Sequence, residues 1–411
     1  TVQDYIFLLL HDQSVDNWQK RPQTPDQPPI ETNSTLIMRQ LSQLTTRIFH
    51  GAAVFYLLWV GPVQAASDPD LSKLENIKLT QLQYIGSHNS YKKALDNRLM
   101  TWLKMFDPDV AESLDYAHSP IETQLDLGLR LFEIDLFYDP EGDRYHEPLG
   151  QQWPFAESSR TMPFTDGVQD SAFKVMHIQD IDFQTHCPTL KDCLRIFSTF
   201  SEANPNHLPI ILTLNLKSDI IDLPGFTEPK PFGGEAFLTL ATEFVEALGH
   251  TRIFTPAELQ GNLPTLSKAV ETLGWPDVNL LRGKYILVFD EPEAKLMPYR
   301  ALEQSAGASL FFGTPKLGHP RAAFLVLNDP IQQRRKILEA VRRGYLVRTR
   351  ADAGTIEARR NNTNRREAAF SSGAQLISTD YYLADPRFEG DYAVQFANQS
   401  FSRRATDQPS D

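Results

Sequence analysis

The sequence is poor in cysteine and has no excess of positive charge. Only 2 of its 411 residues are cysteine, and its 40 Lys and Arg residues are outnumbered by 52 Asp and Glu residues, for a formal net charge of -12 at pH 7. Nucleic acid and strongly anionic bilayers repel such a chain, so we expect no nucleic-acid partner. With 41% hydrophobic and 22% charged residues, the composition is that of an ordinary globular protein.

The N-terminal apolar run is too short for a membrane span. Ile48–Val60 falls below the roughly 20 residues that a spanning helix needs. Val63-Gln64-Ala65 follows it and fits the small-x-small rule for signal-peptide cleavage. We therefore interpret residues 38–65 as a secretory signal peptide and not as a membrane anchor. The mature protein is expected to begin near Ala66 and to be secreted or periplasmic.

Export affects how the two cysteines are interpreted. Cys187 and Cys193 are the only cysteines in the chain. In an oxidising compartment, a lone nearby pair is most simply a disulfide. A zinc site would need more Cys or His close by, and only His186 adjoins the pair. We therefore expect a disulfide and not a zinc site.

After residue 66, short β-branched or aromatic runs alternate with amphipathic helical stretches. The expected strands are Tyr84–His88, Arg130–Phe137, Phe173–His177, Pro209–Asn215, Tyr285–Asp290, Ala323–Asn328, Leu346–Ala351 and Ala374–Asp380. The expected helices are Ile121–Gly128, Leu190–Ala203, Glu235–Leu248, Ile331–Arg343 and Thr363–Ser371. Strands separated by helices in this way predict an α/β fold of the (β/α)8 TIM-barrel type.

The barrel prediction sets the expected domain boundaries. We place one barrel domain at residues 66–390 and a C-terminal tail at residues 391–411. Residues 1–37 precede Met38, the first methionine, and include a polar, proline-rich stretch without periodicity. Such composition is typical of disordered segments, so we interpret these residues as disordered or as a non-native upstream extension.

Polar and apolar side chains alternate along several of these strands. Glu133 and Asp135 share one face of the second strand, for example, while Phe132 and Ile134 share the other. One face of a barrel strand packs against helices, so the polar face must line the lumen. Charge increases toward the C-terminal strand ends, where barrel enzymes keep their chemistry. The long connections 139–172, 216–234 and 291–319 follow strand ends and could wall a substrate cleft.

The polar side chains expected at this rim have complementary chemistry. Carboxylates two residues apart, together with amide oxygens, suit Ca²⁺, and two histidines can donate and accept a proton. Lysine and arginine attract an anionic group such as phosphate. Each feature alone is weak, because a histidine at a strand end is more often structural than catalytic. The candidates are His88, Asn89, Glu133, Asp135, His177, Asn215, Lys217, Asp290, Arg348, Arg350 and Asp380.

Seven segments of the chain form an ordered set of motifs. They are the Cys187/Cys193 segment and Gly86-Ser-His-Asn-Ser-Tyr91, Arg130-Leu-Phe-Glu-Ile-Asp-Leu136, Val175-Met-His177, Pro209-Ile-Ile-Leu-Thr-Leu214, Arg348-Thr-Arg-Ala-Asp352 and Gly373-Ala-Gln-Leu-Ile-Ser-Thr-Asp-Tyr381. Together they resemble the phosphatidylinositol-specific phospholipase C family, most closely its secreted, calcium-dependent bacterial branch. The resemblance runs from about Leu79 to Tyr382, and it implies a barrel of the phospholipase C-like phosphodiesterase type.

The resemblance implies roles for individual residues. His88 and His177 match the two catalytic histidines, and three of the expected calcium ligands are Asn89, Glu133 and Asp135. The fourth ligand position carries Asn215, where the family has an acidic residue, so calcium should bind more weakly or draw on a nearby carboxylate such as Asp290. The expected substrate-binding side chains are Lys217, Arg348 and Arg350.

The reaction implied is attack of the inositol 2-hydroxyl on its own 1-phosphodiester, which yields a cyclic 1,2-phosphate and diacylglycerol. We expect His177 to act as the acid. His88 should stabilise the phosphoryl oxygens and is a candidate base, a role that Glu133 could also fill. We further expect Ca²⁺ as the cofactor, a phosphoinositide or inositol-phosphate substrate met at a membrane surface by transient contact, and a monomeric protein.

Two alternatives remain at this stage. A glycerophosphodiester phosphodiesterase is also a barrel with two acids and a later histidine, but that family begins with a His-Arg-Gly strand end, and this chain has His88-Asn89-Ser90. The other alternative is a secreted inositol-phosphate- or lipid-binding barrel that has lost activity. Asn215 is its only support, and both histidines are present.

Overall fold

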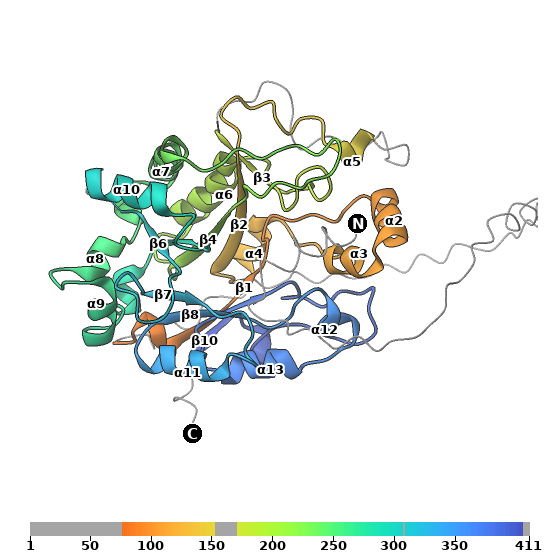
Figure 1. The fold of residues 1–411 in the computed structure, drawn as a ribbon. Coiled ribbons are helices and arrows are strands. Elements are labelled where there is room, and N and C mark those ends of the chain that lie inside the picture. Colours follow the sequence, from red (N-terminus) through yellow and green to blue (C-terminus); the bar gives the residue numbers. More distant parts are fainter. Residues whose placement is uncertain (1–75, 153–170, 307–308, 406–411) are drawn as a thin grey trace, which may run out of the picture. The chain divides into compact units, whose positions relative to one another are not determined.

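The computed structural model describes residues 76–152, 171–306 and 309–405 (Figure 1). Contacts divide the chain into two units, and every described residue belongs to the one that comprises Thr1–Ser14 and Ala65–Asp411. The expected signal peptide and the extension before it lie outside the described residues. Within these ranges, no helix has both the length and the apolar character needed to cross a bilayer.

Eight parallel strands form a nearly closed barrel (Figure 1). Their order around the barrel is β6-β5-β4-β2-β1-β9-β8-β7, and among the described residues no pairing joins β6 to β7. The expected (β/α)8 class is therefore confirmed. The strands are β1 (Leu82–Ser87), β2 (Leu131–Tyr138), β4 (Ile210–Leu216), β5 (Tyr285–Phe289), β6 (Phe311–Gly313), β7 (Phe324–Val326), β8 (Leu346–Arg350) and β9 (Leu376–Thr379).

Two details of the expected strand set are wrong. We expected Phe173–His177 to be the third barrel strand, but β3 (Phe173–Val175) runs antiparallel to β2 and lies off the barrel path. We also expected residues 291–319 to be a connection without a strand, yet they contain β6. A three-residue strand shows too little of the two-residue period to be recognised, and strand direction depends on pairing that local sequence does not encode.

The five expected helices are present, with bounds that differ by up to a few residues. They are α4 (Ile121–Asp126), α6 (Leu190–Ala203), α7 (Gly234–Leu248), α11 (Arg334–Arg342) and α13 (Asn364–Ser371). Among the described residues, seven further α-helices were not expected, because most of them are short. These are α2 (Asn97–Phe106), α3 (Pro108–Leu114), α5 (Leu149–Gln152), α8 (Pro256–Gln260), α9 (Leu266–Thr272), α10 (Met297–Ala306) and α12 (Ile356–Arg359).

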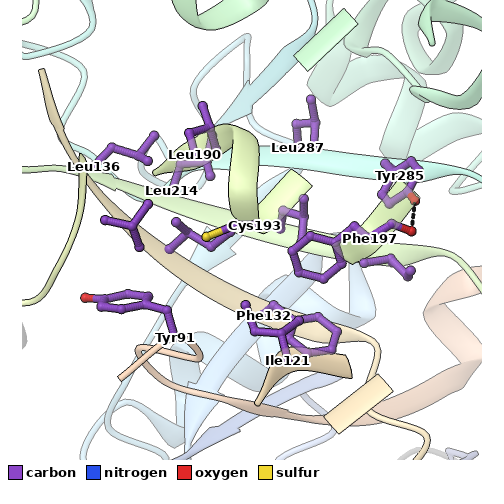
Figure 2. Packing of buried hydrophobic residues seen from close by; sticks show 14 of the residues in the cluster. Tyr91, Ile121, Phe132, Leu136, Leu190, Cys193, Phe197, Leu214, Tyr285 and Leu287 are labelled. Carbon is purple, nitrogen blue, oxygen red and sulfur yellow. Dashed lines mark hydrogen bonds between the residues drawn. The ribbon is translucent and has the colours of Figure 1, made fainter. Parts of the chain in front are cut away.

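Helix α6 shows how the outer layer is built. Thr189 begins it with a capping box in which its hydroxyl accepts from the Asp192 amide and the Asp192 carboxylate accepts from the Thr189 amide. Its apolar face packs on the sheet, where the rings of Phe132 and Phe197 are 5.1 Å apart (Figure 2). Burying one such aromatic side chain contributes about 2–3 kcal/mol.

The expected disulfide is confirmed at the start of this helix. Cys187 and Cys193 are bonded, and both are buried in the core cluster that Figure 2 shows around Leu190. At the other end of the chain, β10 (Ser402–Arg404) pairs antiparallel with β1. The disulfide therefore links α6 to the segment before it, and β10 adds an antiparallel strand beside β1.

Candidate active site

The site begins where β1 and β2 approach each other unusually closely. A Cβ atom at Gly86 would lie 2.2 Å from the carbonyl oxygen of Leu131, so only glycine fits. Just beyond, the Ser90 amide donates to the Glu133 carbonyl at 3.0 Å, and the Glu133 amide donates to the Ser90 hydroxyl at 2.9 Å. Asn89 adopts a φ of 51°, a conformation that asparagine tolerates better than most residues. These contacts bring His88 beside Glu133.

His88 lies in a shell of charged groups. Its Nδ1 is 2.8 Å from Oδ1 of Asp380, and its Nε2 is 3.2 Å from Nη1 of Arg350 and 3.7 Å from Oε1 of Glu133. Because the carboxylate accepts from Nδ1, the hydrogen-bond pattern assigns the proton to that nitrogen and leaves a lone pair on Nε2. Burial and Arg350 both lower the pKa of His88. The imidazole is therefore arranged as a neutral acceptor.

The carboxyl groups of Asp380 and Asp352 differ in protonation. Arg350 donates to Oδ2 of Asp380 at 2.8 Å, and Oδ1 of Asp352 accepts from the Asp380 amide at 2.8 Å. Burial alone would raise the pKa of Asp380, but Arg350 and His88 hold it well below its usual range. The pKa of Asp352 is instead raised to about 7 by burial and by the charge of Asp380. Asp380 is thus the ionised partner of the imidazole.

The carboxylates of β2 are paired with cationic side chains. Arg348 forms an ion pair with Glu133 and donates to Oδ2 of Asp290 at 2.5 Å. Nζ of Lys217 lies 2.9 Å from Oδ2 of Asp135. The three side chains expected to bind substrate are therefore at the expected rim, but each is held by a carboxylate there, Arg350 included.

His177 lies in the turn that follows β3. Its Nδ1 is 2.8 Å from Oδ2 of Asp182, and Nζ of Lys92 lies 3.2 Å from the same oxygen. No hydrogen bond or ion pair among the described residues joins His177 directly to His88. The two histidines are linked instead by the segment after β1, in which Lys92 forms a β-bridge with Thr185.

Four oxygen-bearing side chains could hold a calcium ion. Asp135 and Asn215 lie in register on neighbouring strands, and Glu133 precedes Asp135 on the same face. Asn89 donates its amide nitrogen to the Tyr116 hydroxyl, so its amide oxygen is the atom left to offer. Oδ1 of Asp135 is buried without a hydrogen-bond partner among the described residues. These donors have the hard chemistry that Ca²⁺ prefers.

The acid count of this set is low for a calcium site. Within the described ranges, no cluster of three or more His, Cys, Asp or Glu side chains is arranged to hold a metal ion. With Asn215 at the fourth position, Glu133 and Asp135 are the only acids of the set. A cation would also have to compete with Arg348 and Lys217 for those carboxylates.

Several side chains of the site were not identified from the sequence. Asp182 accepts from His177 and pairs with Lys92, while Nε2 of His118 donates to the His88 carbonyl at 2.6 Å. The Tyr116 hydroxyl lies 3.4 Å from Nδ1 of His88. The only available signal was that Lys92 follows the Gly86–Tyr91 motif directly. Nothing local distinguishes the others from solvated polar residues.

A family model covers most of the chain, and several solved structures are similar to it. A family model described as Ca²⁺-dependent phosphoinositide phospholipase C matches residues 77–405. Among solved structures, the apo form of the calcium-dependent phosphoinositol-specific phospholipase C of a Pseudomonas species is 17% identical, with a TM-score of 0.49 over 82% of this chain and 97% of that one. Its myo-inositol complex gives the same values. The Streptomyces antibioticus enzyme is 15% identical, with a TM-score of 0.47 over 74% and 95%. No curated protein matches.

Proposed function

The chain belongs to the Ca²⁺-dependent phosphoinositide phospholipase C family, and on that premise we propose that it cleaves phosphatidylinositol-type phosphodiesters to inositol 1,2-cyclic phosphate and diacylglycerol. The observation that carries this proposal is His88, held between Asp380 at Nδ1 and Arg350 at Nε2. A base beside a guanidinium suits a substrate in which a hydroxyl lies next to a phosphate. The family match also favours this function over a glycerophosphodiester phosphodiesterase.

His88 is the base in this proposal. Its Nε2 takes the proton of the inositol 2-hydroxyl while that oxygen attacks phosphorus, and Asp380 stabilises the imidazolium that forms. Glu133, the other candidate base, is engaged by Arg348 and is therefore less suited to accept a proton. Arg350 stabilises charge that develops on the phosphoryl oxygens, a role supported by its distance of 3.2 Å from Nε2 of His88.

His177 is the acid. When His177 is protonated on both ring nitrogens, Asp182 accepts from Nδ1, and Nε2 gives its proton to the departing glycerol oxygen as the bond from phosphorus to that oxygen breaks. Each histidine then returns to its starting protonation by exchange with solvent. Two histidines with separate carboxylate partners suit this division of roles.

We assign the calcium site to Asn89, Glu133, Asp135 and Asn215, with Asp290 as the nearby carboxylate. When bound, calcium would supply positive charge next to the phosphoryl group. Lys217 and Arg348 contribute cationic side chains at the same place and partly neutralise the carboxylates. Together with Arg350, they form the substrate-binding set.

Helix α2 supports a transient contact with a membrane surface. It follows β1 and therefore lies on the side of the barrel to which the C-terminal strand ends point. Met105 and Phe106 are 70% and 50% exposed, and the rings of Trp102 and Phe106 are 4.1 Å apart. Exposed apolar side chains of this kind partition into the bilayer interface.

The Cys187–Cys193 disulfide is consistent with the proposed secreted or periplasmic location. We propose that the protein acts as a monomer.

One assay tests the function. The purified protein is incubated with phosphatidylinositol vesicles, with and without a calcium chelator, and cyclic inositol phosphate is measured. We expect the product to form with calcium and to be lost with chelator or with His88→Ala. Release of glycerol phosphate from a glycerophosphodiester, without cyclic product, would support the other enzyme class. A folded protein without turnover on either substrate would support the inactive binding barrel.

A further inference from the structure

We propose that Lys92 is a positioning residue that keeps both histidines in place for the reaction proposed above, on which this inference rests. Lys92 lies four residues after His88 and follows the first-strand motif directly. Its side chain is completely buried. Burying an ammonium group costs several kcal/mol unless it is paired and hydrogen-bonded, so the partners that compensate it must be held firmly.

The partners of Lys92 come from three segments. Its Nζ lies 3.2 Å from Oδ2 of Asp182 and donates to the carbonyl oxygens of Leu114 and Tyr116 at 3.1 and 3.0 Å. The carbonyl of Lys93 is at 3.4 Å. The same nitrogen is 4.6 Å from the centre of the Tyr116 ring. One buried cation therefore ties the segment after β1 to the end of α3 and to the turn after β3.

One branch of this network reaches His177. Oδ2 of Asp182 accepts from Nδ1 of His177 at 2.8 Å and also faces Lys92. The other oxygen of Asp182 is buried without a hydrogen-bond partner among the described residues. The orientation of the carboxylate, and with it that of the imidazole, therefore depends on Lys92. A histidine whose Nδ1 is fixed in this way presents Nε2 to the leaving group.

The other branch reaches His88. Lys92 holds the backbone and the ring of Tyr116, and the Tyr116 hydroxyl accepts from Nδ2 of Asn89 at 2.8 Å and lies 3.4 Å from Nδ1 of His88. The Lys92 amide also donates to the Asn89 carbonyl at 2.9 Å. The lysine thus supports the base through Tyr116 and the acid through Asp182, although it touches neither imidazole.

Lys92→Met tests the proposal, because methionine keeps much of the volume and removes the cation. We expect kcat to fall about 10- to 100-fold with little change in KM, as for other residues that orient a catalytic histidine. The loss should shrink with a nitrophenyl leaving group, which departs without a proton from His177. Lys174→Met is the matched control. Lys174 is also buried and lies 3.9 Å from a carboxylate, that of Asp139, but it contacts neither histidine network.

A readout that does not depend on activity separates this inference from the proposed function. In ¹⁵N-histidine NMR of the unmodified protein, His177 should carry a slowly exchanging proton on Nδ1. That proton should exchange faster in Lys92→Met and remain slow in Lys174→Met. An unmodified protein with the His177 proton on Nε2 alone would overturn the proposal, even if Lys92→Met failed to fold. Unchanged exchange and kcat within about twofold in a folded Lys92→Met protein would overturn it as well.

Discussion

Nδ1 of His88 and Oδ1 of Asp380 lie 2.8 Å apart although 292 residues separate them in the chain. Parallel pairing of Ser87 with Thr379 on β1 and β9 places the two side chains at the same level of the rim. A carboxylate at this distance fixes the imidazole tautomer and stabilises its protonated form. The properties of His88 should therefore depend on Asp380 as much as on its own strand.

Asp380→Asn should lower kcat by about 10²–10⁴-fold and change KM little, because the partner of the base acts mainly in the transition state. Turnover of phosphatidylinositol vesicles at saturating substrate measures this. Asp385→Asn is the control, since Asp385 follows the same strand but pairs with Arg387. Equal kcat values for the two variants would contradict the pairing of His88 with Asp380.

His177→Ala should lose about 10²–10⁴-fold in kcat on phosphatidylinositol, the usual contribution of a general acid. The loss should shrink when the leaving group is a nitrophenol, because that oxygen departs without a proton. His88→Ala should show no comparable rescue, since the hydroxyl must lose its proton with either substrate. Equal losses of His177→Ala on both substrates would exclude His177 as the acid.

Asp135→Asn should weaken calcium binding at least about tenfold, because the set already has Asn215 in place of an acid. Asn215→Glu should tighten binding for the same reason. Isothermal titration of calcium into each variant measures both effects. Calcium affinity that is unchanged in Asp135→Asn, or full activity in excess chelator, would exclude this metal site.

His118 should make the protein sensitive to mild acid. Burial lowers its pKa from 6.5 to about 4 in the folded protein. Between these values the unfolded state binds the extra proton, so the free energy of unfolding falls as the pH drops from 6.5 toward 4, by up to about 3 kcal/mol. In urea unfolding measured between pH 6.5 and 4, the free energy of unfolding of His118→Gln should fall less than that of the unmodified protein. The exposed His250→Gln variant should retain the full decrease.

The Cys187–Cys193 disulfide should stabilise the fold by about 2–3 kcal/mol, since it closes a short loop. Cys187→Ala combined with Cys193→Ala should lower the free energy of unfolding by about that amount. Reduction of the unmodified protein provides the matched comparison. The same stability with and without reductant would show that the covalent link contributes nothing measurable.

The sequence alone determined the features that depend on neighbouring residues. Hydrophobic periodicity and a capping box specify α6, and alternation along β2 places Glu133 and Asp135 on one face. The close spacing of Cys187 and Cys193 predicted their bond. The order of the motifs was enough to predict the barrel, which is confirmed, and to select the two histidines as candidates, because each motif occupies a few consecutive residues.

Only the tertiary structure decided which groups pair across strands. It turned β3 antiparallel, added β6 to the barrel, and joined His88 to Asp380 and His177 to Asp182. These outcomes depend on strand register and on burial, and both are set by contacts between distant segments. The buried ammonium of Lys92 is the clearest case. The residues next to Lys92 in the sequence do not distinguish it from a solvent-exposed lysine. Only its burial beside Asp182 does so.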